Sequence, residues 1–229
     1  MLPIKNKMFS EVTRTWNPVP GCRHDCNYCF ARELAEGRLR HLPRYADGFT
    51  PKLIEEELRR RFHKGLIFVC DMGDLFGEWV PGDWIRKVLD VVRQSPKAEF
   101  LFLTKNPARY HEFRDESLPN VIWGATIETN RDIQGISQAP SPTRRYEEMT
   151  TLRSWQRRIV SIEPIMDFDL QPLVRRIRQI GPEFIYIGFD NHGHHLPEPP
   201  LAKTLELIQA LEQFTEVRLK TIRKAHWEG

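Results

Sequence analysis

Short apolar runs alternate with amphipathic stretches along most of the chain. The run LIFVCD (66–71) is rich in β-branched and aromatic residues, which is typical of a buried strand. The stretch 81–94 that follows places a tryptophan and three valines on one face at helical spacing. The same alternation predicts further strands at 12–18, 99–105, 120–128, 157–164 and 183–190, a terminal strand at 216–221, and helices at 106–115, 169–181 and 201–214.

Repeated strand–helix units predict a parallel sheet with helices packed outside it. Six such units are enough for an open barrel, so the expected fold is α/β, a partial parallel (βα)6 barrel. We expect one domain over 1–229, ending in a short basic segment, 216–229. The Pro-rich stretch 138–143 and the Pro/Gly-rich stretch 190–200 are predicted to be loops.

The predicted strands end in residues with useful side-chain chemistry. These are Asp71 and Asp74, then Thr104 and Lys105, Thr126 and Glu128, Ser161 and Glu163, and finally Asp190. Polar residues at strand ends are common without any function, but here the pattern recurs on five strands. Because the carboxyl ends of parallel strands meet at one edge, we expect these side chains to converge on one mouth.

Three of the four cysteines lie in the segment GCRHDCNYCF (21–30), as Cys22, Cys26 and Cys29. Three thiolates in one loop suit a [4Fe–4S] cluster and leave one iron without a protein ligand. A structural zinc site would need a fourth ligand, for which Cys70 and His24 are the candidates. Otherwise Cys70 is interpreted as an inert, buried thiol.

Composition favours a cytoplasmic protein. No apolar run approaches the ~20 residues of a membrane span, and the N-terminus lacks the apolar core of a signal peptide. Thiols in the cytoplasm stay reduced, so the cysteine segment indicates a metal or redox site and not a disulfide framework. The net charge of +3 fits an anionic partner without establishing one. The histidines of HGHH (192–195) are interpreted as polar loop residues and not as a second metal site.

The three cysteines, with Tyr28 directly before the third, resemble the signature of radical S-adenosylmethionine (SAM) enzymes. The segments TWNPVPGC, CDMGDLFGEWVP, FLFLTKNPARY, LPNVIWGATIE and RRIVSIEPIMDF are similar, in order, to a phage-type protein family catalogued as a domain of unknown function. The resemblance implies a partial barrel of radical SAM type. It also implies that a [4Fe–4S] cluster reductively cleaves SAM to a 5′-deoxyadenosyl radical, which abstracts hydrogen from a substrate. The electron donor would be a protein such as flavodoxin or ferredoxin.

The resemblance also implies roles for individual residues. Cys22, Cys26 and Cys29 would hold the cluster, and Tyr28 would lie near the adenine of SAM. The remaining cofactor contacts would come from Met72, Gly73, Asp74, Lys105, Thr126, Glu128, Ser161 and Glu163. The chain departs from the family at GFDNHGHH (188–195), where relatives carry a glycine-rich turn, and at its C-terminal end.

The sequence does not identify the substrate. We favour a base of DNA or RNA, which must leave its stack to be reached, over a small metabolite. Four basic residues near the C-terminus are expected to meet phosphates: Arg218, Lys220, Arg223 and Lys224. The alternative is a non-catalytic zinc or iron–sulfur protein that binds nucleic acid. Unless a large substrate plugs the mouth, the loops 138–143 and 190–200 are expected to close it.

Overall fold

The computed structural model describes residues 9–113, 116, 118–153 and 156–229. The described chain forms one parallel sheet of seven strands, whose order in space follows the sequence. The strands are β1 (Val12–Trp16), β2 (Leu66–Val69), β3 (Glu99–Thr104), β4 (Val121–Thr126), β5 (Arg157–Ile162), β6 (Phe184–Ile187) and β7 (Glu216–Leu219). The α-helices are α1 (Phe30–Glu36), α2 (Gly82–Arg93), α3 (Pro142–Thr150), α4 (Leu170–Ile180) and α5 (Leu201–Leu211). Three 3₁₀ segments are η1 (Pro43–Tyr45), η2 (Glu55–Arg59) and η3 (Pro107–Phe113).

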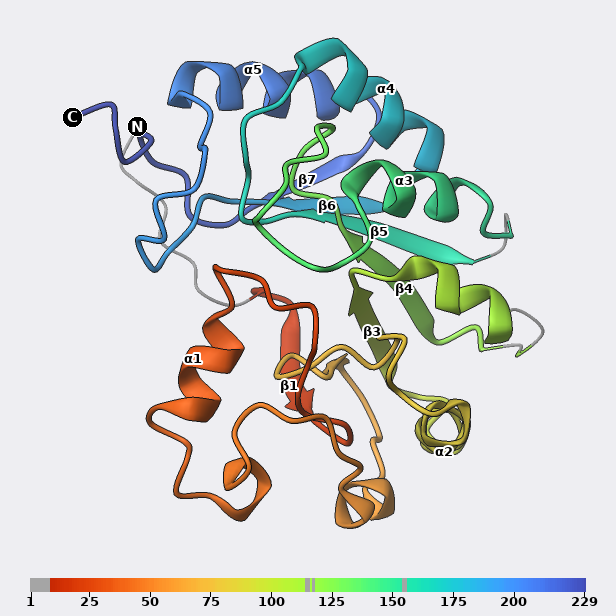
Figure 1. The fold of residues 1–229 in the computed structure, drawn as a ribbon. Coiled ribbons are helices and arrows are strands. Elements are labelled where there is room, and N and C mark those ends of the chain that lie inside the picture. Colours follow the sequence, from red (N-terminus) through yellow and green to blue (C-terminus); the bar gives the residue numbers. More distant parts are fainter. Residues whose placement is uncertain (1–8, 114–115, 117, 154–155) are drawn as a thin grey trace.

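The sheet curls into an open half-barrel, with α2 to α5 along its outer side (Figure 1). Among the described residues no pairing joins β7 to β1, so the barrel stays open along that side. This architecture confirms the predicted partial parallel barrel, and the predicted terminal strand is β7. No helix in the described part of the chain is long and apolar enough to span a membrane.

Two apolar layers stabilise the sheet, one on each face, because successive strand residues point to opposite sides. The outer layer joins the strands to the helices; α2 contributes Ile85, Val88 and Leu89, spaced by three and four residues along one face. The inner layer contains strand residues such as Leu101 and Ile159 and is closed by Phe9. Full burial of each such side chain stabilises the fold by about 1.5–3 kcal/mol.

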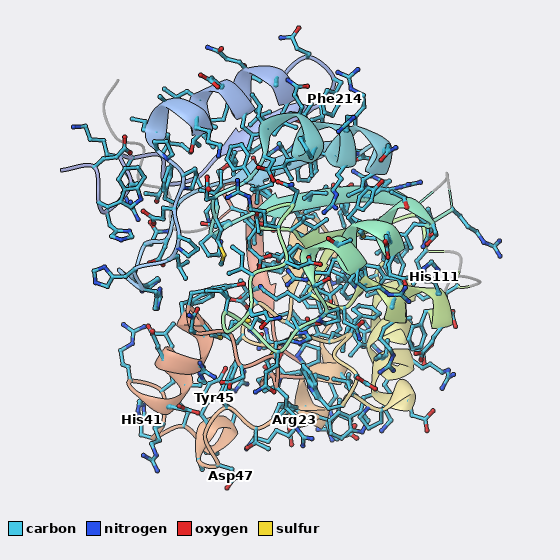
Figure 2. All side chains as sticks on the ribbon, turned by 45° about the horizontal axis from the view of Figure 1, so that its top comes forward. Arg23, His41, Tyr45, Asp47, His111 and Phe214 are labelled. Carbon is cyan, nitrogen blue, oxygen red and sulfur yellow. The ribbon has the colours of Figure 1, made fainter. Side chains whose placement is uncertain are left out.

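The long connection between β1 and β2 forms a lobe beside the edge of the barrel, and this lobe carries the cysteine segment. Figure 2 shows Arg23, His41, Tyr45 and Asp47 together on this lobe, far from Phe214. The lobe has its own small core, in which the ring of Tyr45 packs with residues of α1. The cysteine segment therefore rests on a packed support and not on a free loop.

Several elements differ from the sequence-based expectation. Helix α3 and the segments η1 and η2 were not predicted, and α3 begins inside the predicted loop 138–143. The predicted helix 106–115 is the 3₁₀ segment η3, and positions 114–115 lie outside the described residues. Arg109, inside η3, ties this segment to the chain after β2, because its guanidinium donates to the backbone carbonyls of Gly77, Glu78 and Val80. Helix α1 was not predicted, because its buried residues are only Ala31 and Ala35 and it has no long apolar stripe.

The end of α4 provides a test of the backbone geometry away from the mouth of the barrel. Gly181 ends this helix in the left-handed conformation, with φ +64°, and its N–H donates to the carbonyl of Ile177. No atom lies within 4 Å of an added Cβ, so only backbone strain opposes a side chain. We expect Gly181→Ala to lower the free energy of unfolding by about 1 kcal/mol in urea titrations. Gly181→Asn is the control and should lose less, because asparagine tolerates this conformation; an alanine variant as stable as wild type would contradict the assignment.

Candidate functional site

A cavity of about 500 Å³ opens at the carboxyl ends of the strands. The cysteine segment, the ends of β2 to β5 and the loop after β6 all contribute to its wall. The residues predicted from the sequence that line it are Cys22, Cys26, Tyr28, Cys29, Gly73, Asp74, Lys105, Thr126, Ser161 and Glu163. The structure therefore brings together at one mouth side chains that are up to 141 positions apart, from Cys22 to Glu163.

Two predicted cofactor residues lie outside this wall. Met72 is buried in the lobe, where it packs against Tyr45 and Phe49. Glu128 borders a second, smaller cavity of about 290 Å³. Its carboxylate accepts hydrogen bonds from the hydroxyl of Tyr28 and from Nη1 of Arg145, the latter at 2.6 Å. Glu128 thus fixes the ring of Tyr28, and the direct cofactor contact expected from the sequence is not supported.

Cationic side chains of the protein itself neutralise the Glu128 carboxylate. Burial raises the pKa of its carboxyl, but the Arg145 guanidinium and the Lys105 ammonium, whose Nζ lies 3.6 Å from Oε1, lower this pKa to about 2. The same ammonium lies 5.2 Å from the centroid of the Tyr28 ring, within the range of a cation–π contact. Lys105 is therefore a buried partner of Glu128 and Tyr28 and not a solvated lysine.

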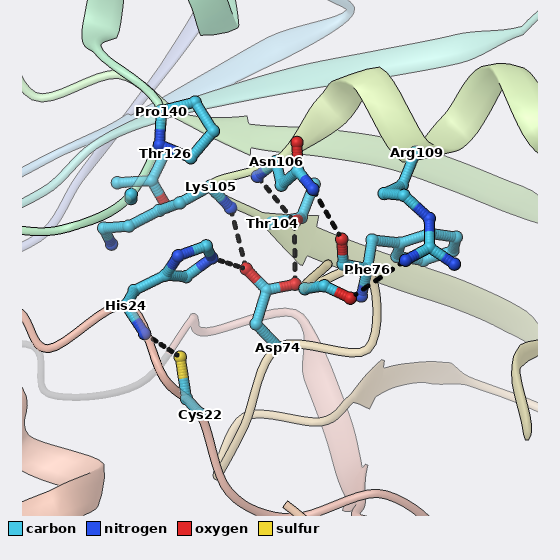
Figure 3. Close-up of polar contacts among 12 residues, drawn as sticks. Cys22, His24, Asp74, Phe76, Thr104, Lys105, Asn106, Arg109, Thr126 and Pro140 are labelled. Carbon is cyan, nitrogen blue, oxygen red and sulfur yellow. Dashed lines mark hydrogen bonds and ion pairs between the residues drawn. The ribbon is translucent and has the colours of Figure 1, made fainter. Parts of the chain in front are cut away.

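Asp74 connects the cysteine segment to the sheet (Figure 3). Its Oδ2 accepts from Nε2 of His24 and from the backbone N–H of Lys105, each at 2.9 Å. Its Oδ1 accepts from Oγ1 of Thr104 at 2.7 Å and from the N–H of Phe76 at 3.0 Å. A carboxylate offers about four lone-pair sites, and four donors occupy them here. Donors within the protein therefore occupy the acceptor sites of Asp74, and its contact with the SAM ammonium stays a prediction from the sequence.

The environment of Asp74 keeps it ionised. Burial alone would raise the pKa of its carboxyl, but the hydrogen bond and charge of His24, together with the Lys105 and Thr104 donors, hold the pKa below its usual range. The His24 ring is itself buried and packs edge-on against Trp79, with 4.7 Å between ring centroids. Since Nε2 of His24 is bound to Asp74, this histidine acts as an anchor of the cysteine segment.

All three cysteines of the segment carry free thiols. Cys29 is the N-cap of α1, and its sulfur accepts from the N–H of Arg32 at 3.4 Å. The sulfur of Cys22 accepts from the N–H of His24 at 3.4 Å. Burial raises the pKa of both thiols. Within the described ranges, no three His, Cys, Asp or Glu side chains are placed to hold a metal ion as they stand.

The donor set nevertheless fits an iron–sulfur cluster. Three free thiols on one short loop line the same cavity, and thiolate is the ligand that such clusters require. Two glycines fix the path of the loop: Gly21 has φ +94°, and an added Cβ would lie 2.5 Å from Pro51 N. A Cβ at Gly73 would lie 2.6 Å from the carbonyl oxygen of Val19. Backbone segments therefore pack against one another here more closely than any side chain at these two positions would permit.

Both predicted loops reach the cysteine segment. The N–H of Gln138 donates to the carbonyl of His24 at 2.7 Å. In the second loop, Nε2 of His194 lies 2.8 Å from Oε1 of Glu33 on α1, and Nδ1 lies 2.8 Å from Oδ1 of Asp190. The rings of Phe30 and His192 also stack, with centroids 6.2 Å apart. Closure of the mouth by these loops, or by a large substrate, stays a prediction from the sequence.

The basic residues near the C-terminus do not form the phosphate-binding surface that the sequence predicted. Three of the four are bound to carboxylates: Arg218 to Glu216, Lys220 to Glu163, and Arg223 to Glu198. Lys220 is also buried in the wall of the cavity. Glu216 lies two residues before Arg218 in β7, but Glu163 and Glu198 belong to other segments, so the sequence alone does not reveal the neutralisation of Lys220 and Arg223.

The role of Asp74 as an anchor gives a prediction about stability. Asp74→Asn leaves the donors of His24 and Lys105 facing a neutral amide, and we expect the free energy of unfolding to fall by about 3–5 kcal/mol. Asp71→Asn is the matched control, because its Oδ1 accepts from Asn17 Nδ2 at 2.7 Å and an amide oxygen replaces it. This control should lose less than about 1 kcal/mol in the same urea titration. Equal stability of the two variants would show that Asp74 does not anchor the segment.

The fold resembles that of solved radical SAM enzymes. Spore photoproduct lyase complexed with a dinucleoside spore photoproduct matches with a TM-score of 0.62 at 12% identity, over 88% of this chain and 75% of the lyase. A mutant of that lyase with bound AdoMet matches with a TM-score of 0.58 at 11% identity, over 87% of this chain and 61% of the lyase. SuiB of Streptococcus suis bound to SAM matches with a TM-score of 0.52 at 10% identity, over 91% of this chain and 46% of SuiB. At these identities the similarity shows the fold, a partial barrel of radical SAM type.

The sequence comparison gives a family without an activity. No curated protein sequence matches the chain. The model of a family described as a protein of unknown function, DUF5131, matches residues 8–178. The match includes the cysteine segment and the ends of β1 to β5, and it stops before β6. Because it covers most of the chain, this protein belongs to the DUF5131 family.

Proposed function

We propose that this protein is a radical SAM enzyme. The observation that carries the proposal is that the three free cysteines of the segment line one cavity at the carboxyl ends of a partial barrel. When bound there, the [4Fe–4S] cluster would supply one electron that cleaves SAM into methionine and a 5′-deoxyadenosyl radical, which takes a hydrogen atom from the substrate.

Cys22, Cys26 and Cys29 would hold the cluster, and ligation would require their thiols to lose protons. Burial raises the pKa of Cys22 and Cys29, so the free thiols stay protonated and binding of the cluster must drive their ionisation. The loops 138–143 and 190–200 contact the cysteine segment and would exclude water from the cavity. Exclusion of water protects a reactive intermediate from side reactions.

The side chains that support SAM binding lie around Tyr28. Its ring is fixed by Glu128 and lies beside the Lys105 ammonium, which gives a rigid surface near the third cysteine. Thr126 and Ser161 line the cavity at the ends of β4 and β5 and offer hydroxyls to the ribose or to the methionine part. The Glu163 carboxylate is bound to Lys220 at 3.3 Å, so it supports this role less well.

The fold does not decide the substrate, because the chain spans 61% of the lyase and 46% of SuiB. The solved lyase structure holds a dinucleoside, whereas another SuiB structure holds a precursor peptide. We favour a base of DNA or RNA, in keeping with the positive net charge. A cytoplasmic location, a phage-type origin and a donor such as flavodoxin or ferredoxin stay predictions from the sequence.

The cysteine assignment predicts the outcome of single substitutions. Changing Cys22, Cys26 or Cys29 to Ala should abolish 5′-deoxyadenosine formation from SAM and dithionite, because each variant lacks one of three cluster ligands. The product is measured by chromatography after anaerobic reconstitution with iron and sulfide.

Cys70→Ala is the matched control. Cys70 is buried in the same wall but lies outside the cysteine segment, and its thiol pKa is raised by burial. This variant should keep cluster content and product formation near wild type. Product formation by the three loop variants would contradict the assignment, and loss of bound metal from all four variants would favour the four-cysteine zinc site.

A further inference from the structure

One end of the cavity lies away from the cysteines and is built from the ends of β5 to β7. Lys220, which follows β7, is 4% exposed, and its Nζ lies 3.3 Å from Oε2 of Glu163, which follows β5. Both side chains line the cavity together with Ser161. Lys220 is buried and Glu163 is half-buried. An ion pair of this kind seldom adds stability over an apolar pair of the same size, so we consider recognition of a ligand as its role.

The backbone of β6 makes room for this pair. A Cβ at Gly188 would lie 2.7 Å from Cβ of Lys220 and 3.4 Å from Oε1 of Glu163. Any residue larger than glycine would displace the lysine stem from its present position. The pair is therefore built into the strand ends and is not a chance contact of two flexible side chains.

Aromatic rings flank the same end. The ring of Phe9 lies 4.6 Å from Nζ of Lys220, and the rings of Phe9 and Phe68 stack with centroids 5.4 Å apart. The Phe9 ring is held from its other side by Tyr186, at a centroid distance of 3.7 Å. Phe9 and Phe68 both line the cavity. Because Tyr186 and Nζ of Lys220 already lie over the Phe9 ring, Phe68 is the ring that suits contact with a flat, uncharged group.

The charge at this end disfavours an anion. Glu163 compensates the Lys220 ammonium, and the second carboxylate in this part of the wall, that of Asp190, is paired with His194. A phosphate or carboxylate placed beside Lys220 would therefore compete with the Glu163 carboxylate for the same ammonium. The group that enters here should be neutral, which excludes the phosphate-binding role that the sequence gave to Lys220.

We propose that the Lys220–Glu163 end of the cavity binds the hydrogen-bonding edge of a nucleobase, which identifies the substrate class of the proposed radical SAM enzyme. The pair presents a donor and an acceptor side by side, 3.3 Å apart. The edge of a purine or pyrimidine likewise carries an acceptor and a donor on adjacent atoms, whereas a trans main-chain amide points them in opposite directions. Lys220 donates to the ring acceptor, Glu163 accepts from the ring N–H, and Phe68 contacts the face of the ring.

This inference rests on the proposed function, so the experiment distinguishes failure of the nucleobase site from failure of the radical SAM assignment. Full-length protein is reconstituted anaerobically and saturated with unlabelled SAM, which keeps adenosine out of the cofactor site. Retention of labelled probes is then measured by equilibrium dialysis. The probes are the common ribonucleosides, thymidine and a short single strand of thymidylates. Dialysis requires no turnover, whereas the proposed function is tested separately by 5′-deoxyadenosine formation in wild type.

We expect wild type to retain at least one probe. Glu163→Gln and the double variant Lys220→Met/Glu163→Gln should lower that retention about tenfold or more, because each removes a charged hydrogen-bonding partner of the base. The double variant removes both charges of the Lys220–Glu163 pair together, so it does not leave the Glu163 carboxylate facing a lost partner as Lys220→Met alone does. Lys224→Met removes an exposed lysine outside the cavity wall and should retain the probe as wild type does.

The identity of the retained probe shows whether the base belongs to a free nucleoside or to a nucleic acid. Retention of a nucleoside supports a free nucleoside or nucleotide, and retention of the single strand alone supports a base within a nucleic acid. The inference is overturned if wild type cleaves SAM but retains no probe, or if Glu163→Gln and the double variant retain it fully. It is also overturned if these variants lose SAM retention in step with the probe, since the pair would then belong to the cofactor site.

Discussion

The buried carboxylate of Asp74 is the interaction on which the rest of the site depends. An ionised carboxyl without water is stable only when donors surround it, and the four donors here come from the cysteine segment, the turn after β2 and the end of β3. These segments are far apart in the sequence, so satisfying one charge brings them together. The position of the cysteines over the strand ends follows from this requirement, as does the close approach of the glycine-rich backbone at Gly21 and Gly73.

Other carboxylates around the cavity are likewise neutralised by partners within the protein. Glu128 is neutralised by Arg145 and Lys105, Glu163 by Lys220, and Asp190 by His194 and backbone N–H groups. These charged groups of the wall are therefore paired with one another or with backbone donors. Such a wall can orient hydrogen-bonding groups while it holds back free ions. These properties suit a cavity that must bind SAM and shield a radical, and they disfavour the use of the same residues to attract a polyanion.

The strands and the cysteine segment could be predicted from the sequence because both show as local patterns. Apolar runs of strand length and three closely spaced cysteines require no knowledge of distant partners. The roles of Asp74, Glu128 and Lys220 could not be predicted in this way. Each depends on a partner between 17 and 57 positions away, such as His24, Arg145 or Glu163, and a single sequence does not show which charges meet. The position of these residues at the strand ends correctly predicts that most of them lie near the mouth of the barrel. It does not reveal that Asp74, Glu128 and Glu163 already bind partners within the protein.

Electron paramagnetic resonance of the anaerobically reconstituted wild-type protein tests the central claim most directly. The claim is that the anchored cysteine segment holds a [4Fe–4S] cluster with one iron open to SAM. Dithionite should produce the spectrum of a reduced [4Fe–4S] cluster, and addition of SAM should change that spectrum because SAM binds the open iron. A reconstituted protein that holds stoichiometric zinc and shows no iron–sulfur signal, or a cluster spectrum that SAM leaves unchanged, would contradict the account.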